Sequence, residues 1–446
     1  MDSIFDLDHL YRTYFKMALP SVFGLMVSVV YNLADTFFIA QSNDTALIAG
    51  VSLCAPVFTA LMAFGNIYGQ GGSSLISRLL GQDDREGTGR VSSFCFYVAL
   101  TTGVVLAVLM MLFRVPLLGI LGATAETMPY AEAYYTVLAI GAPATVLNFI
   151  HSNLVRCEGM ATQSMIGSIG GTVINIILDP ILITTVGWGA RGAAIATIVA
   201  QVIALMWQFK LFSNKEELLH FHRGIFRLKR KIVFDSLAIG MSPFLMNLAS
   251  CFIVILINQG LKRYGGDLAI GAFGIVNRLV FVFVMIVLGL NQGMQPIAGY
   301  NFGARQYPRV TQVLKLTIIG ATIVTTTGFL LGVFIPELIV SIFTSDAELI
   351  RLSAEGYRIV VMFFPIVGFQ MVTSNFFQSI GMAGKAIFLS LTRQMLFLVP
   401  CLLILPHFYG QTGVWVSMPA SDLAASIVSG LMLWWQFRQF RKMTNG

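Results

Sequence analysis

Apolar segments long enough to cross a bilayer recur from near the N-terminus to the C-terminus. A helix needs about 20 mostly apolar residues to span the hydrocarbon core. Of the 446 residues only 11% are charged, whereas soluble globular domains carry roughly 25%, and the mean hydropathy is +0.79. The chain is therefore predicted to fold within a lipid bilayer.

All of these segments are predicted to be helices. Open strands would leave backbone groups unpaired in lipid, and the segments lack the alternating pattern of outer-membrane barrels. The fold class is an all-α integral membrane protein with twelve spans. They are predicted at 15–39, 47–72, 93–113, 130–153, 164–186, 190–212, 237–262, 268–296, 313–335, 352–378, 386–407 and 412–436.

The membrane topology follows from the distribution of Lys and Arg, which accumulate in cytoplasmic loops. Most basic residues fall on one side of the predicted helices, in the loops that contain Arg85, Lys229 and Arg305 and near the C-terminus. Both termini are therefore predicted to be cytoplasmic in a multi-pass protein of the cytoplasmic (inner) membrane. The first segment is expected to stay uncleaved because the acidic Asp2 and Asp6 precede it.

The same distribution explains the net charge of +7, so no nucleic-acid partner is expected. The five cysteines are scattered and form no CxxC pair, which predicts neither a disulfide framework nor a metal site. Gly384-Lys385 lacks the rest of a phosphate-binding loop, and no GxSxG or HExxH motif occurs. We expect neither an enzyme nor a cofactor, and we expect an ion gradient to supply the energy.

Two copies of one pattern divide the chain. Gln70-Gly71 precedes Gly81, and Gln292-Gly293 precedes Gly303 at the same spacing, while Gly-Met-Ala begins at 159 and, equally displaced, at 381. We predict an N-terminal lobe (1–212), a basic cytoplasmic linker (213–232) and a C-terminal lobe (233–446), each lobe with six helices. Parallel repeats related by a pseudo-twofold axis along the membrane normal are typical of secondary transporters with alternating access.

Asp35 and Asp179 are acidic residues inside predicted helices of the first half. Ionisable groups at membrane depth are costly and usually functional. Asn175 lies four residues before Asp179, so the two side chains share one helix face. Thr197 in the next helix can add a hydroxyl group. Together these groups suit a proton, a cation or a network of hydrogen bonds.

Alternatives remain open for these residues. Asp35 and Asp179 either couple ion movement to transport or cap local polar clusters. Pro20, earlier in the first helix, either permits a bend linked to protonation or makes a static kink. The corresponding positions of the second half hold Ile257 and Cys401, so ion chemistry is expected in the first half alone.

These features resemble the multidrug and toxic compound extrusion (MATE) family, specifically its DinF-like prokaryotic branch. The resemblance covers essentially the full chain and rests on twelve helices in two lobes, the Asp35-Thr36 end of the first helix and the repeated Gln-Gly and Gly-Met-Ala segments. It implies a bend at Pro20. It also implies an N-lobe site for a proton or a sodium ion formed by Asp35, Asn175, Asp179 and Thr197.

The resemblance implies antiport, with small cationic, amphipathic drugs or toxins leaving the cell in exchange for protons, sodium being the alternative ion. Such a transporter needs no partner chain and is expected to be a monomer in the lipid bilayer. Other branches carry acidic residues in the seventh and tenth helices. This chain has Met246 and Asn247 near that place in the seventh helix and Asn375 and Gln378 in the tenth, so a second cation site is not implied. The candidates for the wall of the substrate cavity are Tyr134, Tyr135, Asn153, Asn375 and Gln378.

Two rival functions differ in the features they require. A lipid-linked oligosaccharide flippase of the same superfamily needs a strongly cationic cavity for its pyrophosphate headgroup, and only Arg278 and Arg393 lie well inside predicted helices. A channel or sensory membrane protein needs a repeated ring of charges or an attached signalling domain. Neither feature occurs in the sequence, so drug export is the favoured hypothesis.

Overall fold

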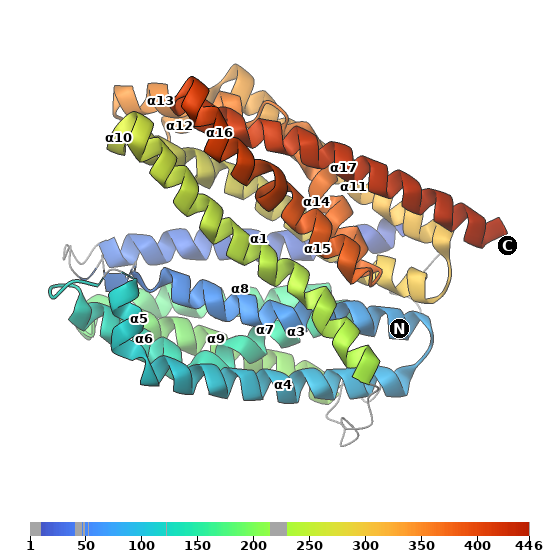
Figure 1. The fold of residues 1–446 in the computed structure, drawn as a ribbon. Coiled ribbons are helices and arrows are strands. Elements are labelled where there is room, and N and C mark those ends of the chain that lie inside the picture. The colour runs from blue at the N-terminus through green and yellow to red at the C-terminus, as the bar shows by residue number, and fades with distance from the viewer. Residues whose placement is uncertain are drawn as a thin grey trace. The chain divides into compact units, whose positions relative to one another are not determined.

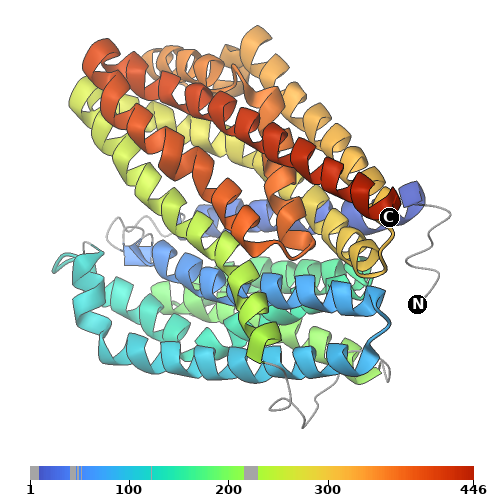
Figure 2. The same cartoon turned by 45° about the vertical axis from the view of Figure 1, so that its right-hand side comes forward.

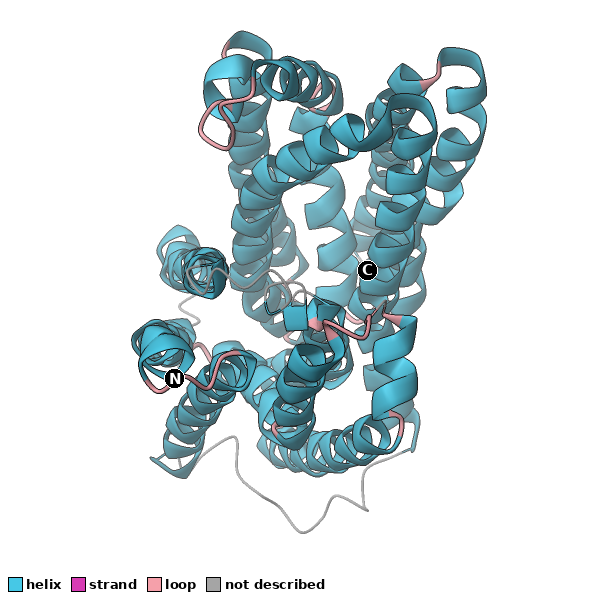
Figure 3. Ribbon diagram, turned by 90° about the vertical axis from the view of Figure 1, so that its left-hand side faces the viewer, coloured by secondary structure: helices cyan, strands magenta, loops and turns pink. Residues whose placement is uncertain are grey.

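The computed structural model describes residues 10–40, 47, 50–51, 53–121, 123–214 and 230–445. All regular structure in these ranges is helical, as Figure 3 shows. The side chains of some helical residues, Asp35 among them, lie outside the described part. Most of the predicted linker 213–232 also lies outside it.

One set of helices belongs to the first half of the sequence and another to the second half, and Figure 1 shows both. The first group is α1 (Leu10–Ala40), α3 (Ala55–Gly81), α4 (Arg85–Leu112), α5 (Arg114–Ile120), α6 (Met128–Ile140), α7 (Ala142–Cys157), α8 (Ala161–Pro180), η2 (Ile181–Thr185) and α9 (Ala190–Asn214). The second is α10 (Arg230–Gly303), α11 (Tyr307–Phe334), α12 (Pro336–Val340), α13 (Ala347–Val360), α14 (Phe364–Ser379), α15 (Ala383–Leu391), η4 (Thr392–Leu398), α16 (Val399–Tyr409) and α17 (Gln411–Asn445).

The predicted spans agree with these helices. Nine of the described helices are long and apolar enough to cross a membrane, and two bent pairs raise the number to 11. The remaining predicted span, 47–72, overlaps α3, whose second half is rich in Gly and Ser. α10 contains two spans that meet at Gly266, where φ is 71° and the helical geometry is interrupted. The all-helical membrane fold is thus confirmed.

Two predicted spans are broken in the middle. The axes of α6 and α7 differ by 55°, and those of α13 and α14 differ by 57°. Pro143 and Pro365 lie in the first turns of α7 and α14. Proline has no backbone N–H to continue the preceding helix, so a new helix starts at each of these points.

The described chain forms two compact units. The N unit comprises Phe23–Gly240, and the C unit comprises Met241–Gly446 together with the start of α1 as far as Val22. These bounds differ from the lobes expected from the repeat, because the start of α1 packs in the C unit and the start of α10 packs in the N unit. The repeat boundaries 1–212 and 233–446 remain a prediction.

Each unit has a tightly packed core of helices. In the N unit α7 packs on α3, α4 and α9, and in the C unit α11 packs on α14 while α17 packs on α14, α16 and η4. Figure 2 shows α16 and α17 running side by side. Small residues and glycines permit such close helix contacts in membranes.

The glycines of the repeated Gln-Gly segments contact the first parts of α10 and α1. A Cβ atom added at Gly71 of α3 would lie 2.1 Å from the carbonyl oxygen of Ser236 in the first part of α10. In the C unit a Cβ atom at Gly293 would lie 2.5 Å from Cα of Ala18 in α1. Both distances are too short for any side chain. The repeat therefore encodes two equivalent helix crossings at which only glycine fits.

A leucine at Gly293 is expected to lower the yield of folded protein severely, because its side chain would displace the backbone of α1. The matched control is Gly274→Leu in the same helix, where a Cβ atom meets nothing within 4 Å. Size-exclusion profiles of detergent-extracted, fluorescently tagged protein measure the yield. Equal monodisperse peaks for the two variants would contradict the proposed crossing.

Candidate functional site

Close packing of α8 on α9 positions the polar residues predicted in the N unit. Gly171 of α8 lies against α9, where an added Cβ atom would be 3.0 Å from the carbonyl oxygen of Ala200. The indole Nε1 of Trp207 in α9 donates a hydrogen bond of 2.8 Å to the carbonyl oxygen of Gln163 in α8. These contacts hold the two helices at a distance at which Asn175 and Thr197 can meet.

A hydrogen-bonded cluster joins three helices of the N unit. Asn175 Nδ2 donates to Tyr31 Oη at 3.2 Å and also lies 3.5 Å from Thr197 Oγ1. Tyr31 Oη and Thr197 Oγ1 are 3.2 Å apart. Thr197 Oγ1 also donates a hydrogen bond of 3.1 Å to the carbonyl oxygen of Ala193. α1, α8 and α9 thus each contribute one member.

Asp179 lies one turn beyond Asn175 on the same face of α8. Asp179 is 0% exposed, Asn175 is 1% exposed and Thr197 is 3% exposed. Pro180 follows directly, and the helix continues as the π-helix η2. Proline removes a backbone donor, and single π-helical turns often occur at functional sites. A buried carboxylate therefore lies at an irregular point of the helix, next to a polar cluster.

One oxygen atom of this cluster has no partner among the described residues. Asn175 Oδ1 is buried and accepts no hydrogen bond from the residues that the structure describes. An orphaned buried amide oxygen is costly unless another group or ion binds it. Asn175 can therefore provide an oxygen ligand to a small cation or accept a hydrogen bond from a protonated group.

The other predicted coupling residues are in α1. Asp35 is four residues after Tyr31, so the two positions share a helix face, but the side chain of Asp35 is outside the described part. Pro20 lies inside α1, which is helical on both sides of it. The coupling role of Asp35 and the bend at Pro20 remain predictions.

The candidates for the wall of the substrate cavity are buried to different extents in the two units. The hydroxyl of Tyr135 donates to the carbonyl oxygen of Met110 at 2.8 Å, and Tyr134 belongs to the buried core of the N unit. Asn153 accepts from Arg156 at 3.0 Å and lies 3.5 Å from Gln70 Nε2. In α14, Asn375 is half-buried and Gln378 is buried. Their contribution to a cavity remains a prediction.

The sequence analysis did not single out two features of the structure. The first is Tyr31. It lies four residues before Asp35, and this spacing could have indicated that the two residues share a helix face. The other is Asp422 in α17, which lies 2.5 Å from Nε of Arg393 in η4 and has a side chain that is only 2% exposed. Asp422 lies inside the predicted span 412–436, so its acidic side chain at membrane depth was the signal.

The N-unit cluster is made of hydroxyl, amide and carboxylate groups. No group of three or more His, Cys, Asp or Glu side chains that could hold a metal ion occurs among the described residues. In the described part, the buried carboxylate of Asp179 lies beside the hydroxyl and amide groups. A carboxyl group in such surroundings can take up a proton or balance one monovalent cation.

A model of the MatE family matches residues 20–181 and 238–403, which is most of the chain. The chain belongs to the MatE family. The multidrug export protein MepA of Staphylococcus haemolyticus is similar to this MatE chain. The two sequences are 30% identical over 422 residues, which cover 94% of this chain and 93% of that protein.

Solved structures agree with this MatE assignment over nearly the whole chain. A MATE protein in a bent conformation superposes with a TM-score of 0.92, at 25% identity over 98% of this chain and 97% of that one. A multidrug resistance MATE transporter of the MOP superfamily in an outward-facing conformation gives a TM-score of 0.88, at 27% identity over 95% of each chain. The family thus makes this MatE chain a multi-pass membrane transporter.

Proposed function

We propose that this MatE chain is a secondary active exporter of cationic amphipathic drugs or toxins, which it exchanges for protons in the cytoplasmic membrane. The observation that carries the proposal is the cluster of Tyr31, Asn175 and Thr197 beside the buried Asp179. The similarity to a protein named as a multidrug exporter supports the choice of substrate. Sodium is the alternative coupling ion.

The proposed mechanism follows from the positions of these groups. A charged carboxylate is costly at membrane depth, so protonation or a bound cation would stabilise Asp179. Asn175 Oδ1, which has no partner among the described residues, supplies a second oxygen ligand. Occupation of the site by the ion changes the hydrogen bonds that join α1, α8 and α9. The coupling therefore acts on the packing of α1 against the rest of the N unit.

Charge balance in the C unit supports cationic substrates over the pyrophosphate headgroup of a lipid-linked sugar. Of the two basic residues predicted inside helices, Arg393 forms an ion pair with Asp422. Its positive charge is thus balanced within the unit. A flippase of this superfamily would need unbalanced cationic groups for its headgroup.

Ethidium efflux from cells that express the wild-type protein or Asp35→Asn tests this function. We expect wild-type efflux to stop when a protonophore collapses the proton gradient, and Asp35→Asn to export at least about tenfold more slowly, because it cannot gain or lose the proton. Efflux that persists with the protonophore but follows the sodium gradient would identify sodium as the ion. Equal efflux by the empty vector and the wild type, at normal expression, would overturn drug export.

A further inference from the structure

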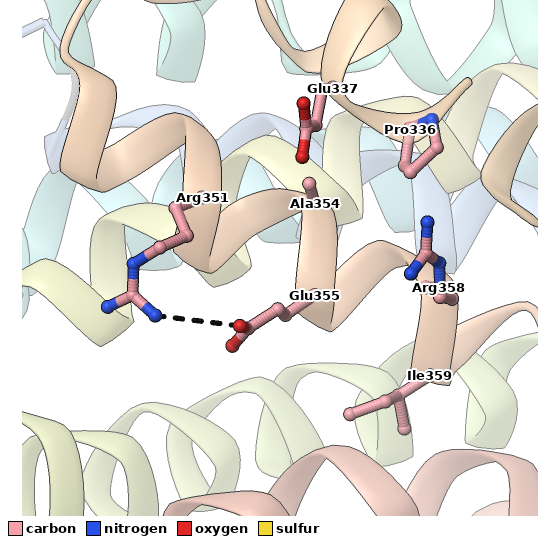
Figure 4. A pocket seen from close by; sticks show the side chains of 7 residues that line it. All are labelled: Pro336, Glu337, Arg351, Ala354, Glu355, Arg358 and Ile359. Atoms are coloured by element: carbon pink, nitrogen blue, oxygen red, sulfur yellow. Dashed lines mark hydrogen bonds and ion pairs between the residues drawn. The ribbon is translucent and has the colours of Figure 1, made fainter. Parts of the chain in front are cut away.

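A charged cavity lies at one end of the C unit, where α12 and α13 meet. Its volume is about 320 Å³, and it is lined by Pro336, Glu337, Arg351, Ala354, Glu355, Arg358 and Ile359. Figure 4 shows Arg351 directed toward Glu355, while Glu337 and Arg358 come from different helices. The topology predicted from the positive-inside rule places this end at the outer surface of the membrane.

The four charged side chains differ in how they are paired. Arg351 contacts Glu348 at 2.5 Å and Glu355 at 3.5 Å, so its guanidinium already has two carboxylate partners. Glu337 and Arg358 form no ion pair with each other or with any other described residue. The only hydrogen bond of the Arg358 side chain in the described part is to the carbonyl oxygen of Val333, at 3.4 Å. One carboxylate and one guanidinium thus line the same cavity without neutralising each other.

Large apolar side chains on and beside α12 are exposed. Leu338 is 63% exposed and Ile342 is 76% exposed, and both are on or directly after α12. Phe334, at the end of α11, is 73% exposed. Large exposed apolar residues in a membrane protein face lipid. The cavity therefore lies where acyl chains end and headgroups begin.

We propose that this cavity binds a phosphate-and-ammonium zwitterion, the phosphoethanolamine headgroup of a membrane lipid. A guanidinium is suited to phosphate oxygens because it offers several N–H donors in one plane, which assigns the phosphate to Arg358. The carboxylate of Glu337 accepts hydrogen bonds from the ammonium. The acyl chains lie along the exposed Leu338 and Ile342. The site is independent of the proposed drug export.

The proposal distinguishes lipids that share acyl chains. Phosphatidylcholine has no N–H group to donate to Glu337, and phosphatidylglycerol has no cation. Since a hydrogen bond to a charged group contributes about 1.5–3 kcal/mol, phosphatidylethanolamine is expected to bind about tenfold more tightly than either. Glu337→Gln should remove this preference, whereas Arg358→Gln should weaken the binding of all three lipids.

Native mass spectrometry of the purified full chain in detergent measures these affinities during titration with each lipid. The control variants are Arg114→Gln and Glu132→Gln, which remove the same groups from an ion pair of 3.1 Å in the N unit, and they should bind lipid as the wild type does. Arg351→Gln should change the affinity for lipid less than Arg358→Gln does, because Arg351 is already paired with Glu348 and Glu355. Free phosphoethanolamine should compete only weakly because it lacks acyl chains.

Three results would overturn the proposal. One is equal binding of the three lipids by the wild type. Another is wild-type lipid selectivity in Glu337→Gln, or wild-type lipid affinity in Arg358→Gln. The third is displacement of the lipid by free phosphoethanolamine at equal concentration, which would make the ligand a soluble zwitterion.

Discussion

Replacement of Asp179 by asparagine is expected to reduce drug efflux to the level of cells without the transporter. Asparagine has nearly the shape of aspartate, but it can neither release a proton nor balance a cation. Asp179 is fully buried and shares a helix face with Asn175. Because the exchange would then lack its ionisable group, we expect a loss of at least about a hundredfold, by analogy with the loss of an essential acid–base group. Ethidium efflux from cells with equal amounts of transporter in the membrane measures it.

The controls separate ion exchange from folding. Asp83→Asn changes a carboxylate in a loop whose side chain is 92% exposed, and it should export normally. Tyr31→Phe removes one hydroxyl from the cluster and should slow export about fivefold, since a typical hydrogen bond contributes about 1 kcal/mol. Normal efflux by Asp179→Asn would show that this carboxylate is a structural cap, which is the alternative that the sequence left open.

Removal of Asp422 is expected to have the largest effect on stability in the C unit. Asp422→Ala leaves the guanidinium of Arg393 without its carboxylate at membrane depth. Breaking a buried ion pair from one side costs about 3–5 kcal/mol. We therefore expect a markedly lower temperature of unfolding, which a thiol-reactive dye or a tagged-protein thermal shift in detergent can follow.

The double variant Arg393→Met with Asp422→Leu provides the matched control. It removes both charges and retains apolar volume, and such replacements are often neutral or stabilising. We expect it to unfold near the wild-type temperature. If the double variant is as unstable as Asp422→Ala, the loss comes from packing rather than from an unpaired charge.

The sequence predicted the helices well because hydropathy acts on each segment separately. Its apolar segments located even the spans that are bent, but not the bends at Pro143 and Pro365. A proline early in an apolar segment is compatible with either a kinked helix or two helices. Neighbouring helices decide between them, and their positions are not encoded in the segment alone.

The candidate site was predicted in part, for a similar reason. Asn175 and Asp179 stand four apart on one helix, so local geometry brings them together. Tyr31 contacts Asn175 only because α1 packs beside α8. From sequence alone, a tyrosine in an apolar segment is usually interpreted as a core residue. The pairing of Arg393 with Asp422 likewise depends on how η4 packs on α17. Contacts between helices therefore account for what the sequence analysis missed.

The compact units differ from the repeat for a related reason. A duplicated sequence shows where each copy begins, but it does not show which helices pack together. The starts of α1 and α10 each pack beside a helix of the other half, and Gly293 and Gly71 provide the space. The repeated Gln-Gly segments were recognised in the sequence, while their partners became evident only in the structure.

The most direct test of the account is the release of protons when purified protein binds ethidium in weakly buffered detergent solution with a pH-sensitive dye. If drug and proton exchange at the N-unit site, the wild type will release protons in proportion to bound ethidium, and Asp179→Asn will bind the drug with much less release. Equal proton release by the two proteins, or drug binding by the wild type with no release with or without sodium, would contradict proton coupling through Asp179.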